Sequence, residues 1–144
     1  MRLCFYVRSL GIGWIDTLTP AASIAPNVDM LKNWLNGLVA GGAKLKHVVL
    51  VAGGKAYDPQ LGHYKTPAKE TDPRIMGPNF YYDQEDFLKE FEAEHGVTWT
   101  VLRPDGIFGP SLGSPMNLVN GMAVFAAISK ELNIPLRFPG SFAA

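Results

Sequence analysis

The segment HVVLVAGG, from His47 to Gly54, constrains the fold more than any other part of this 144-residue chain. Its apolar residues are contiguous, whereas a strand with one face in water alternates apolar and polar side chains. A short β-branched run of this kind, closed by two glycines, is typical of a parallel strand that is covered on both faces. We therefore expect an α/β fold built around a parallel sheet.

The segment upstream of this strand has the 3.6-residue period of an amphipathic helix. We predict that this helix begins at Pro26, that Asn27 is its N-cap, and that Gly41 and Gly42 end it. Its apolar face contains four residues at helical spacing, namely Leu31, Trp34, Leu35 and Leu38.

Downstream, the pattern predicts a helix from Asn79 to His95, a strand from Val97 to Arg103 and a helix from Asn117 to Leu132. The last helix is apolar nearly all round, so we expect it to be buried against other protein. Two shorter strands are predicted at residues 3–7 and 136–138. The alternation of strands and helices favours a parallel sheet with helices packed against it.

The composition excludes several classes of protein. Hydrophobic residues make up 47% and charged residues 18% of the chain, which excludes a disordered tail or a coiled coil. Thirteen basic and thirteen acidic residues cancel, so no net charge favours nucleic acid or an anionic membrane. One cysteine cannot form an internal disulfide, and three scattered histidines do not make a metal site.

The N-terminus has a weak likeness to a signal peptide, with early Arg2 and small residues near Ala25. Arg8 breaks its apolar run and Asp16 interrupts the approach to any cleavage site. No apolar run is long enough to span a membrane. Secretion stays open as the alternative, and we expect a cytoplasmic protein.

Three segments are predicted to meet at the carboxyl edge of the sheet, where open parallel sheets bind their ligands. They are Gly53–Tyr57 after the first strand, Asn79–Tyr82 at a helix start, and Arg103–Pro110 after the next strand. A lysine beside a tyrosine favours phenolate and lowers the phenol pKa. A tyrosine tuned in this way can stabilise a developing oxyanion.

Structural roles for the same residues remain open. Lys55 can be a solvated charge at the end of a strand, and Arg103 can form a simple ion pair there. Tyr81 and Tyr82 can be packing residues with hydroxyl groups in water. The Gly54-Lys55 pair is not a phosphate-binding P-loop, because Ala56 replaces the required hydroxyl residue.

Six stretches of the chain together resemble a known family. They are NVDMLKNWL, LKHVVLVAGGKAY, PNFYYDQEDFL, TWTVLRPDGIFG, SPMNLVNGMAVFAAISKE and PLRFPG, which run from about Asn27 to Gly140. In this order they are similar to the progesterone 5β-reductase/iridoid synthase-like branch of the short-chain dehydrogenase/reductases. The resemblance implies a partial Rossmann-like parallel sheet with flanking helices. It places a cofactor domain at residues 1–110 and the start of a small substrate domain at residues 111–144.

The resemblance also implies an activity, which is NADPH-dependent reduction of a carbon–carbon double bond conjugated to a carbonyl. Tyr81 and Lys55 match the branch's catalytic tyrosine and lysine, although four residues beyond Tyr81 stands Glu85 where the wider superfamily has lysine. The implied substrate is a small α,β-unsaturated carbonyl compound, and no metal, nucleic acid or membrane is implied. The implied cofactor-binding residues are Gly53, Arg103, Pro104, Ile107, Ser114 and Met116, and the implied substrate-binding residues are Phe108 and Asn117.

One departure from the family concerns the cofactor. Relatives begin with a strand, a Gly-rich turn and a helix that bind the pyrophosphate, and this sequence has no such motif. We therefore expect a chain truncated at both ends, with weak NADP(H) binding and a tendency to form homo-oligomers. The alternatives are an inactive remnant that acts as an interaction module, a carbonyl reductase, or a sugar-nucleotide epimerase or dehydratase.

Overall fold

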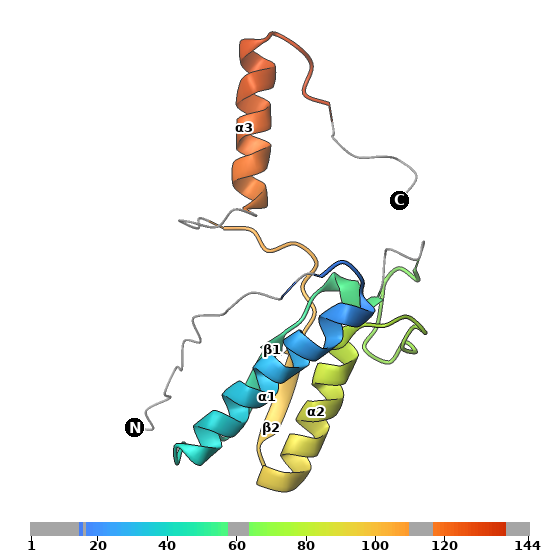
Figure 1. Ribbon diagram of the computed structural model, residues 1–144. Helices are drawn as coiled ribbons and strands as arrows, with labels where there is room; N and C mark the ends of the chain where they lie inside the picture. Colours follow the sequence, from blue (N-terminus) through green and yellow to red (C-terminus); the bar gives the residue numbers. More distant parts are fainter. Residues whose placement is uncertain (1–14, 16, 58–63, 110–116, 138–144) are drawn as a thin grey trace. The chain divides into compact units, whose positions relative to one another are not determined.

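The computed structural model of the chain describes residues 15, 17–57, 64–109 and 117–137 (Figure 1). The described residues divide into two compact units, which we call the first unit (15–50 and 74–100) and the second unit (51–73 and 101–137). The longer elements, in chain order, are α1 (Ile24–Ala40), β1 (His47–Val51), α2 (Phe80–His95), β2 (Thr98–Leu102) and α3 (Leu118–Glu131), with 3₁₀ helices η1 (Ala21–Ser23) and η2 (Gly54–Tyr57).

The two strands form a parallel pair, as the sequence predicted. Beyond the strand ends, the Ala52 N–H donates to the Leu102 carbonyl at 2.8 Å and the Gly54 N–H donates to the Pro104 carbonyl at 3.0 Å. From the first hydrogen bond to the second, the donor and the acceptor both move two residues towards the C-terminus, which is the parallel pattern. The α/β class is therefore confirmed.

The core of the first unit lies where α1 and α2 pack side by side (Figure 1). Leu35 of α1 and Leu88 of α2 are 0% and 1% exposed, and Phe91 of α2 is 2% exposed. Both ends of α2 have the expected caps. The Asn79 side chain accepts a hydrogen bond from the Tyr81 N–H, and Gly96 ends the helix with φ of +66°.

The predicted start of α1 is wrong by two residues. The helix begins at Ile24, and Asn27 is a fully buried residue inside it and not the N-cap. Its amide nitrogen donates to the carbonyls of Ile15 and Ser23, and its side-chain oxygen accepts from the Ile15 N–H. Pro26 lies in the first turn of α1, where proline is tolerated.

Strand β1 also differs from its prediction. Val48 is buried and Leu50 is partly buried, but Val49 and Val51 are each 55% exposed. Alternate side chains of a strand point to opposite faces, so one face is covered and the other is open among the described residues. A contiguous apolar run does not by itself say which face is covered.

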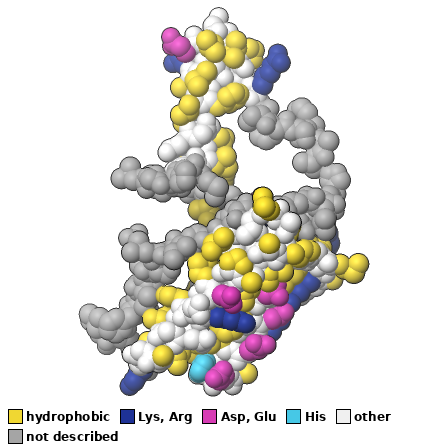
Figure 2. Space-filling view, viewed as in Figure 1, with side chains coloured by type: hydrophobic (Ala, Val, Ile, Leu, Met, Phe, Trp, Pro, Cys, Tyr) yellow, Lys and Arg dark blue, Asp and Glu magenta, His cyan; other side chains and the backbone are white. Residues whose placement is uncertain are grey.

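Helix α3 has the predicted position but not the predicted burial. Its apolar side chains are exposed, with Leu118 at 50%, Met122 at 56% and Ile128 at 52%, and Figure 2 shows hydrophobic atoms over this helix. No described segment covers it. Leu136 and Arg137 form no strand, and Phe138 and the strand expected at residues 3–7 lie outside the described residues. Among the helices described, none has the length and apolar character needed to cross a membrane.

Candidate functional site

The loops that follow β1 and β2 lie against each other within the second unit. The backbone hydrogen bond from Gly54 to Pro104 joins them, and a Cβ at Gly54 would lie 3.1 Å from a carboxylate oxygen of Asp105. The predicted meeting of the segments around Gly53 and Arg103 is therefore confirmed. It follows from the parallel strand pair, whose carboxyl ends share one edge.

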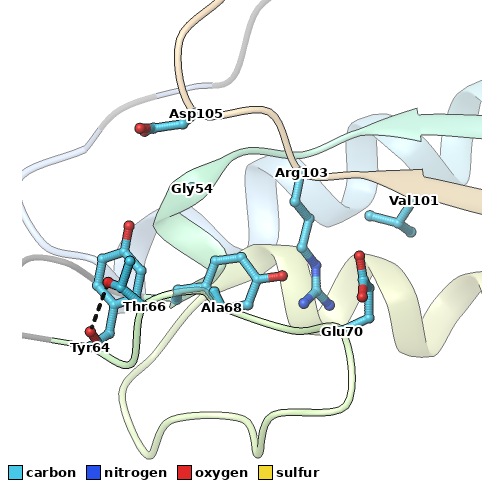
Figure 3. A pocket seen from close by; sticks show the side chains of 9 residues that line it. Gly54, Tyr64, Thr66, Ala68, Glu70, Val101, Arg103 and Asp105 are labelled. Carbon is cyan, nitrogen blue, oxygen red and sulfur yellow. Dashed lines mark hydrogen bonds between the residues drawn. The ribbon is translucent and has the colours of Figure 1, made fainter.

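A cavity of about 310 Å³ opens beside these two loops, still within the second unit (Figure 3). The Arg103 guanidinium lies 5.3 Å from the centre of the Tyr57 ring, which is a cation–π distance. The Tyr57 and Tyr64 rings are stacked at 6.0 Å with 15° between their planes. The lining residues are Gly54, Tyr57, Tyr64, Thr66, Ala68, Glu70, Val101, Arg103 and Asp105.

This lining combines two aromatic rings with a cation, two carboxylates and three hydroxyl groups. Such a mixture suits a small organic molecule that carries one polar end, since apolar walls give affinity and few polar groups give orientation. Sequence reasoning missed Tyr64, Thr66 and Glu70. The available signal was the length of the loop between η2 and α2, because long loops in compact domains often have a binding role.

Lys55 lies on η2 and is exposed, and it does not line this cavity. Tyr81 lies in the first turn of α2, partly buried, with the Phe80 ring 4.5 Å away. Tyr81 belongs to the first unit and Lys55 to the second, so their pairing stays a prediction.

The pKa of the Tyr81 phenol is shifted in the opposite direction to the one expected. Burial raises the pKa of Tyr81 above its usual value, whereas the sequence predicted a lowered pKa. Burial disfavours the charged phenolate, so the group stays neutral at physiological pH and keeps its proton. A neutral phenol is a hydrogen-bond donor, which suits it to hold a carbonyl oxygen.

The neighbouring Tyr82 has a different environment. Its hydroxyl accepts a hydrogen bond from the Ile75 N–H at 3.3 Å, and the Arg74 guanidinium lies 4.9 Å from the centre of its ring. Both contacts hold the segment before α2 against the helix. The structure therefore gives Tyr82 a structural role and separates it from Tyr81.

The remaining predicted residues lie in the loop after β2 or at the start of α3. Ile107 and Phe108 are 72% and 62% exposed. Asn117 caps α3, since its side chain accepts from the Asn120 N–H and donates to the Gly109 carbonyl, each at 3.2 Å. The binding roles of these three residues stay predictions. Ser114 and Met116 lie outside the described residues.

Charged residues in the described part of the chain form ion pairs and no metal-binding group. Within these residues, no three or more His, Cys, Asp or Glu side chains gather in a way that could hold a metal ion.

Comparisons with known proteins agree with this fold. The chain is 40% identical over 140 residues to an (S)-8-oxocitronellyl enol synthase of Camptotheca acuminata, which covers 92% of this chain and 36% of that protein. It is 41% identical over 133 residues to an (S)-8-oxocitronellyl enol synthase of Nepeta racemosa, covering 88% and 34%. It is 38% identical over 146 residues to a 3-oxo-Delta(4,5)-steroid 5-beta-reductase of Arabidopsis thaliana, covering 95% and 36%.

The chain thus spans about a third of the length of the curated relatives it matches. A family model described as a PRISE-like Rossmann-fold domain matches residues 10–140, which is nearly the whole chain. The expected likeness to progesterone 5β-reductase and iridoid synthase is confirmed, and so is the Rossmann-type fold. The chain belongs to the PRISE-like Rossmann-fold domain family.

Proposed function

We propose that the protein carrying this sequence catalyses the NADPH-dependent 1,4-reduction of a small α,β-unsaturated carbonyl compound. The observation that carries the proposal is the 38–41% identity, over most of the chain, to proteins named as enol synthases and as a steroid 5β-reductase. Both names fit hydride addition to the β-carbon of a conjugated carbonyl. That addition leaves an enolate, which becomes an enol or a saturated ketone on protonation.

The chain's own residues suit the nicotinamide end of a dinucleotide. Gly53 and Gly54 bring no side chain to the carboxyl edge of the strands, and Arg103 supplies a cation beside a cavity of about 310 Å³. We propose that Gly53, Arg103, Pro104 and Ile107 hold the cofactor there, together with Ser114 and Met116. NADPH, when bound, supplies the hydride.

Tyr81 is the proposed hydrogen-bond donor to the substrate carbonyl. As the double-bond electrons move towards that oxygen, negative charge develops on it, and a preorganised phenol O–H stabilises this charge. The raised pKa of Tyr81 keeps the donor proton in place. Lys55 is proposed to support the phenol with its positive charge, and Phe108 and Asn117 to contact the substrate.

The test measures NADPH consumption with two substrates, 2-cyclohexen-1-one and a 3-oxo-Δ4 steroid. Tyr81→Phe is expected to lower kcat by about 100- to 1000-fold, which is the usual loss for one oxyanion donor, with the KM for NADPH unchanged. Tyr82→Phe, one residue along, is the matched comparison and is expected to cost no more than about fivefold. Lys55→Met is expected to lower kcat and to shift its pH profile.

Several results would contradict the proposal. Near-normal turnover by Tyr81→Phe with a large loss in Tyr82→Phe would transfer the role to Tyr82. An allylic alcohol as product would show 1,2-reduction and favour a carbonyl reductase. Absence of any reduction by the unmodified protein, with NADPH binding also absent in calorimetry, would favour an inactive interaction module.

A further inference from the structure

We infer that Arg74 is a positioning residue, which fixes the first turn of α2 and with it the side chain of Tyr81. The functional half of this inference rests on the proposed role of Tyr81, and the structural half does not. Arg74 lies outside every motif that the sequence singled out. It belongs to the first unit, together with α2, so all contacts used below lie within one compact unit.

The Arg74 guanidinium forms a two-pronged ion pair with Asp86. One nitrogen donates to one carboxylate oxygen at 2.7 Å, and another donates to the second oxygen at 2.9 Å. The latter nitrogen also reaches the carboxylate of Glu85 at 3.2 Å. Planar, paired contacts of this kind set an orientation as well as a distance, which a lysine cannot do.

The same arginine also contacts the Tyr82 ring. Its guanidinium lies 4.9 Å from the centre of the Tyr82 ring, while the backbone N–H of the next residue, Ile75, donates to the Tyr82 hydroxyl at 3.3 Å. The short segment at residues 74–75 is thus tied both to the first turn of α2 and to its second turn. Tyr81 directly precedes Tyr82 in the first turn of α2.

The helix cap completes this arrangement. The Asn79 side chain accepts from the Tyr81 N–H at 3.1 Å, so the backbone of Tyr81 is held directly. The direction of the Tyr81 side chain depends on the orientation of this first turn, because helix ends fray when their caps are lost. We call the contacts of Arg74 with Tyr82, Glu85 and Asp86 the Arg74 clamp.

A plain surface ion pair is the competing interpretation. The Arg74 side chain is 37% exposed and that of Asp86 is 51% exposed, and pairs of such exposure contribute little to stability. The two interpretations differ in what a substitution changes. A surface pair would alter stability slightly and leave turnover intact, whereas a positioning residue alters kcat more than stability.

The experiment compares Arg74→Met with Lys89→Met in the protein that carries this sequence, with NADPH and 2-cyclohexen-1-one. Lys89 is the matched control, because it pairs with the same Asp86 carboxylate at 2.8 Å but only closes one turn of α2. Arg74→Met is expected to lower kcat by about 10- to 100-fold, with the KM for NADPH within about twofold of its original value. Lys89→Met is expected to change neither, and Arg74→Lys is expected to recover only part of the lost kcat.

Hydrogen exchange tests the structural half without any assay of activity. In Arg74→Met, amides at residues 75–82 are expected to exchange faster, while those at residues 88–95 keep their protection. If Arg74→Met fails to fold, Tyr82→Phe replaces it, since that variant removes only the hydroxyl that accepts from Ile75. The expected direction is then the same, with a loss in kcat of about fivefold.

Unchanged exchange at residues 75–82 would overturn the clamp. Unchanged kcat in Arg74→Met, or equal losses in Arg74→Met and Lys89→Met, would overturn its role in turnover. Full recovery by Arg74→Lys would show that charge and not geometry matters, which also overturns the inference. Failure of the proposed function is recognised separately, because Tyr81→Phe would then leave turnover unchanged while the exchange result still stands.

Discussion

The two units of the chain differ in the contacts that stabilise each of them internally. Nearly all buried apolar residues of the described chain lie in the first unit, with Leu35, Leu88 and Phe91 at its centre. The second unit contributes one, Ala56. It relies on directional contacts, such as the Arg103–Tyr57 cation–π pair and the ion pair of Lys65 with Asp72 at 2.8 Å.

This difference separates stability from chemistry within one short chain. Burial of apolar area is the main source of folding free energy, so the first unit supplies most of it. The second unit carries the cavity and the strand-end loops, where polar groups remain accessible to a ligand. Tyr81 is the exception, since this candidate catalytic residue stands on the well-packed unit.

The largest difference between the units is expected when one large apolar side chain is removed from each, a buried one from the first unit and an exposed one from the second. Leu88→Ala is expected to lower the free energy of unfolding by about 2–5 kcal/mol, because it leaves a cavity in a closed core. Met122→Ala, on the exposed face of α3, is expected to change it by less than about 0.5 kcal/mol. Chemical denaturation followed by circular dichroism measures both. Equal losses in the two variants would show that α3 is covered as well as the first unit is.

Within the first unit, the buried amide of Asn27 contributes polar contacts in addition to the apolar core. Asn27→Ala is expected to cost about 3 kcal/mol, because three hydrogen bonds disappear and the backbone of Ile15 loses its partners. Asn36→Ala is the control, an exposed residue on the same helix, and it is expected to be neutral or slightly stabilising. A loss below about 0.5 kcal/mol for Asn27→Ala would mean that the hydrogen bonds between Asn27 and Ile15 do not contribute to stability.

The ion pairs of Asp86 are expected to make stability depend weakly on pH in the acid range. Hydrogen bonds from Arg74 and Lys89 lower the pKa of Asp86 from its ordinary 3.8 to about 2. A lowered pKa in the folded state stabilises the protein above the ordinary pKa, and the contribution disappears as the pH falls from about 4 to about 2. Asp86→Asn should therefore lower the melting temperature near pH 6 and lose this difference near pH 2.

The measurement compares melting temperatures of the original and the Asp86→Asn proteins at several pH values between these limits. Carboxylates that share no partner with Asp86 are expected to titrate alike in both proteins and to cancel in the difference. Glu90→Gln, an exposed position on the same helix, is the control. If the melting-temperature difference between the two proteins grew towards low pH, the lowered pKa of Asp86 could not be its cause.

Local patterns in the sequence were sufficient to place α1, α2, α3, β1 and β2 to within a few residues, but Leu136 and Arg137 do not form the strand predicted there. Asn79 and Gly96 marked the ends of α2 because capping depends on a few neighbouring residues. Asn27 looked like a cap for the same reason, yet its side chain is buried and hydrogen-bonded to the backbone of Ile15, twelve residues away. The exposure of Val49 and of the apolar residues of α3 could not be predicted, since it depends on which segments cover them.

The candidate site was predictable at the strand ends and not beyond them. A parallel strand pair places Gly53 and Arg103 at one edge, so their placement followed from the fold class. The contribution of Tyr64 and Glu70 to the cavity depends on the path of a long loop, which has no periodic signal. Arg74 was missed because its partners lie eleven and twelve residues along the chain, outside any helical or strand spacing.

The close approach of Gly54 to Asp105 has a consequence for evolution. A methyl group at position 54 would lie 3.1 Å from the Asp105 carboxylate, which would have to shift by a few tenths of an ångström. The backbone cannot withdraw freely, because the Gly54 N–H is bonded to the Pro104 carbonyl. Positions 54 and 105 are therefore expected to covary among relatives, with a side chain gained at the first accompanied by a shorter one at the second.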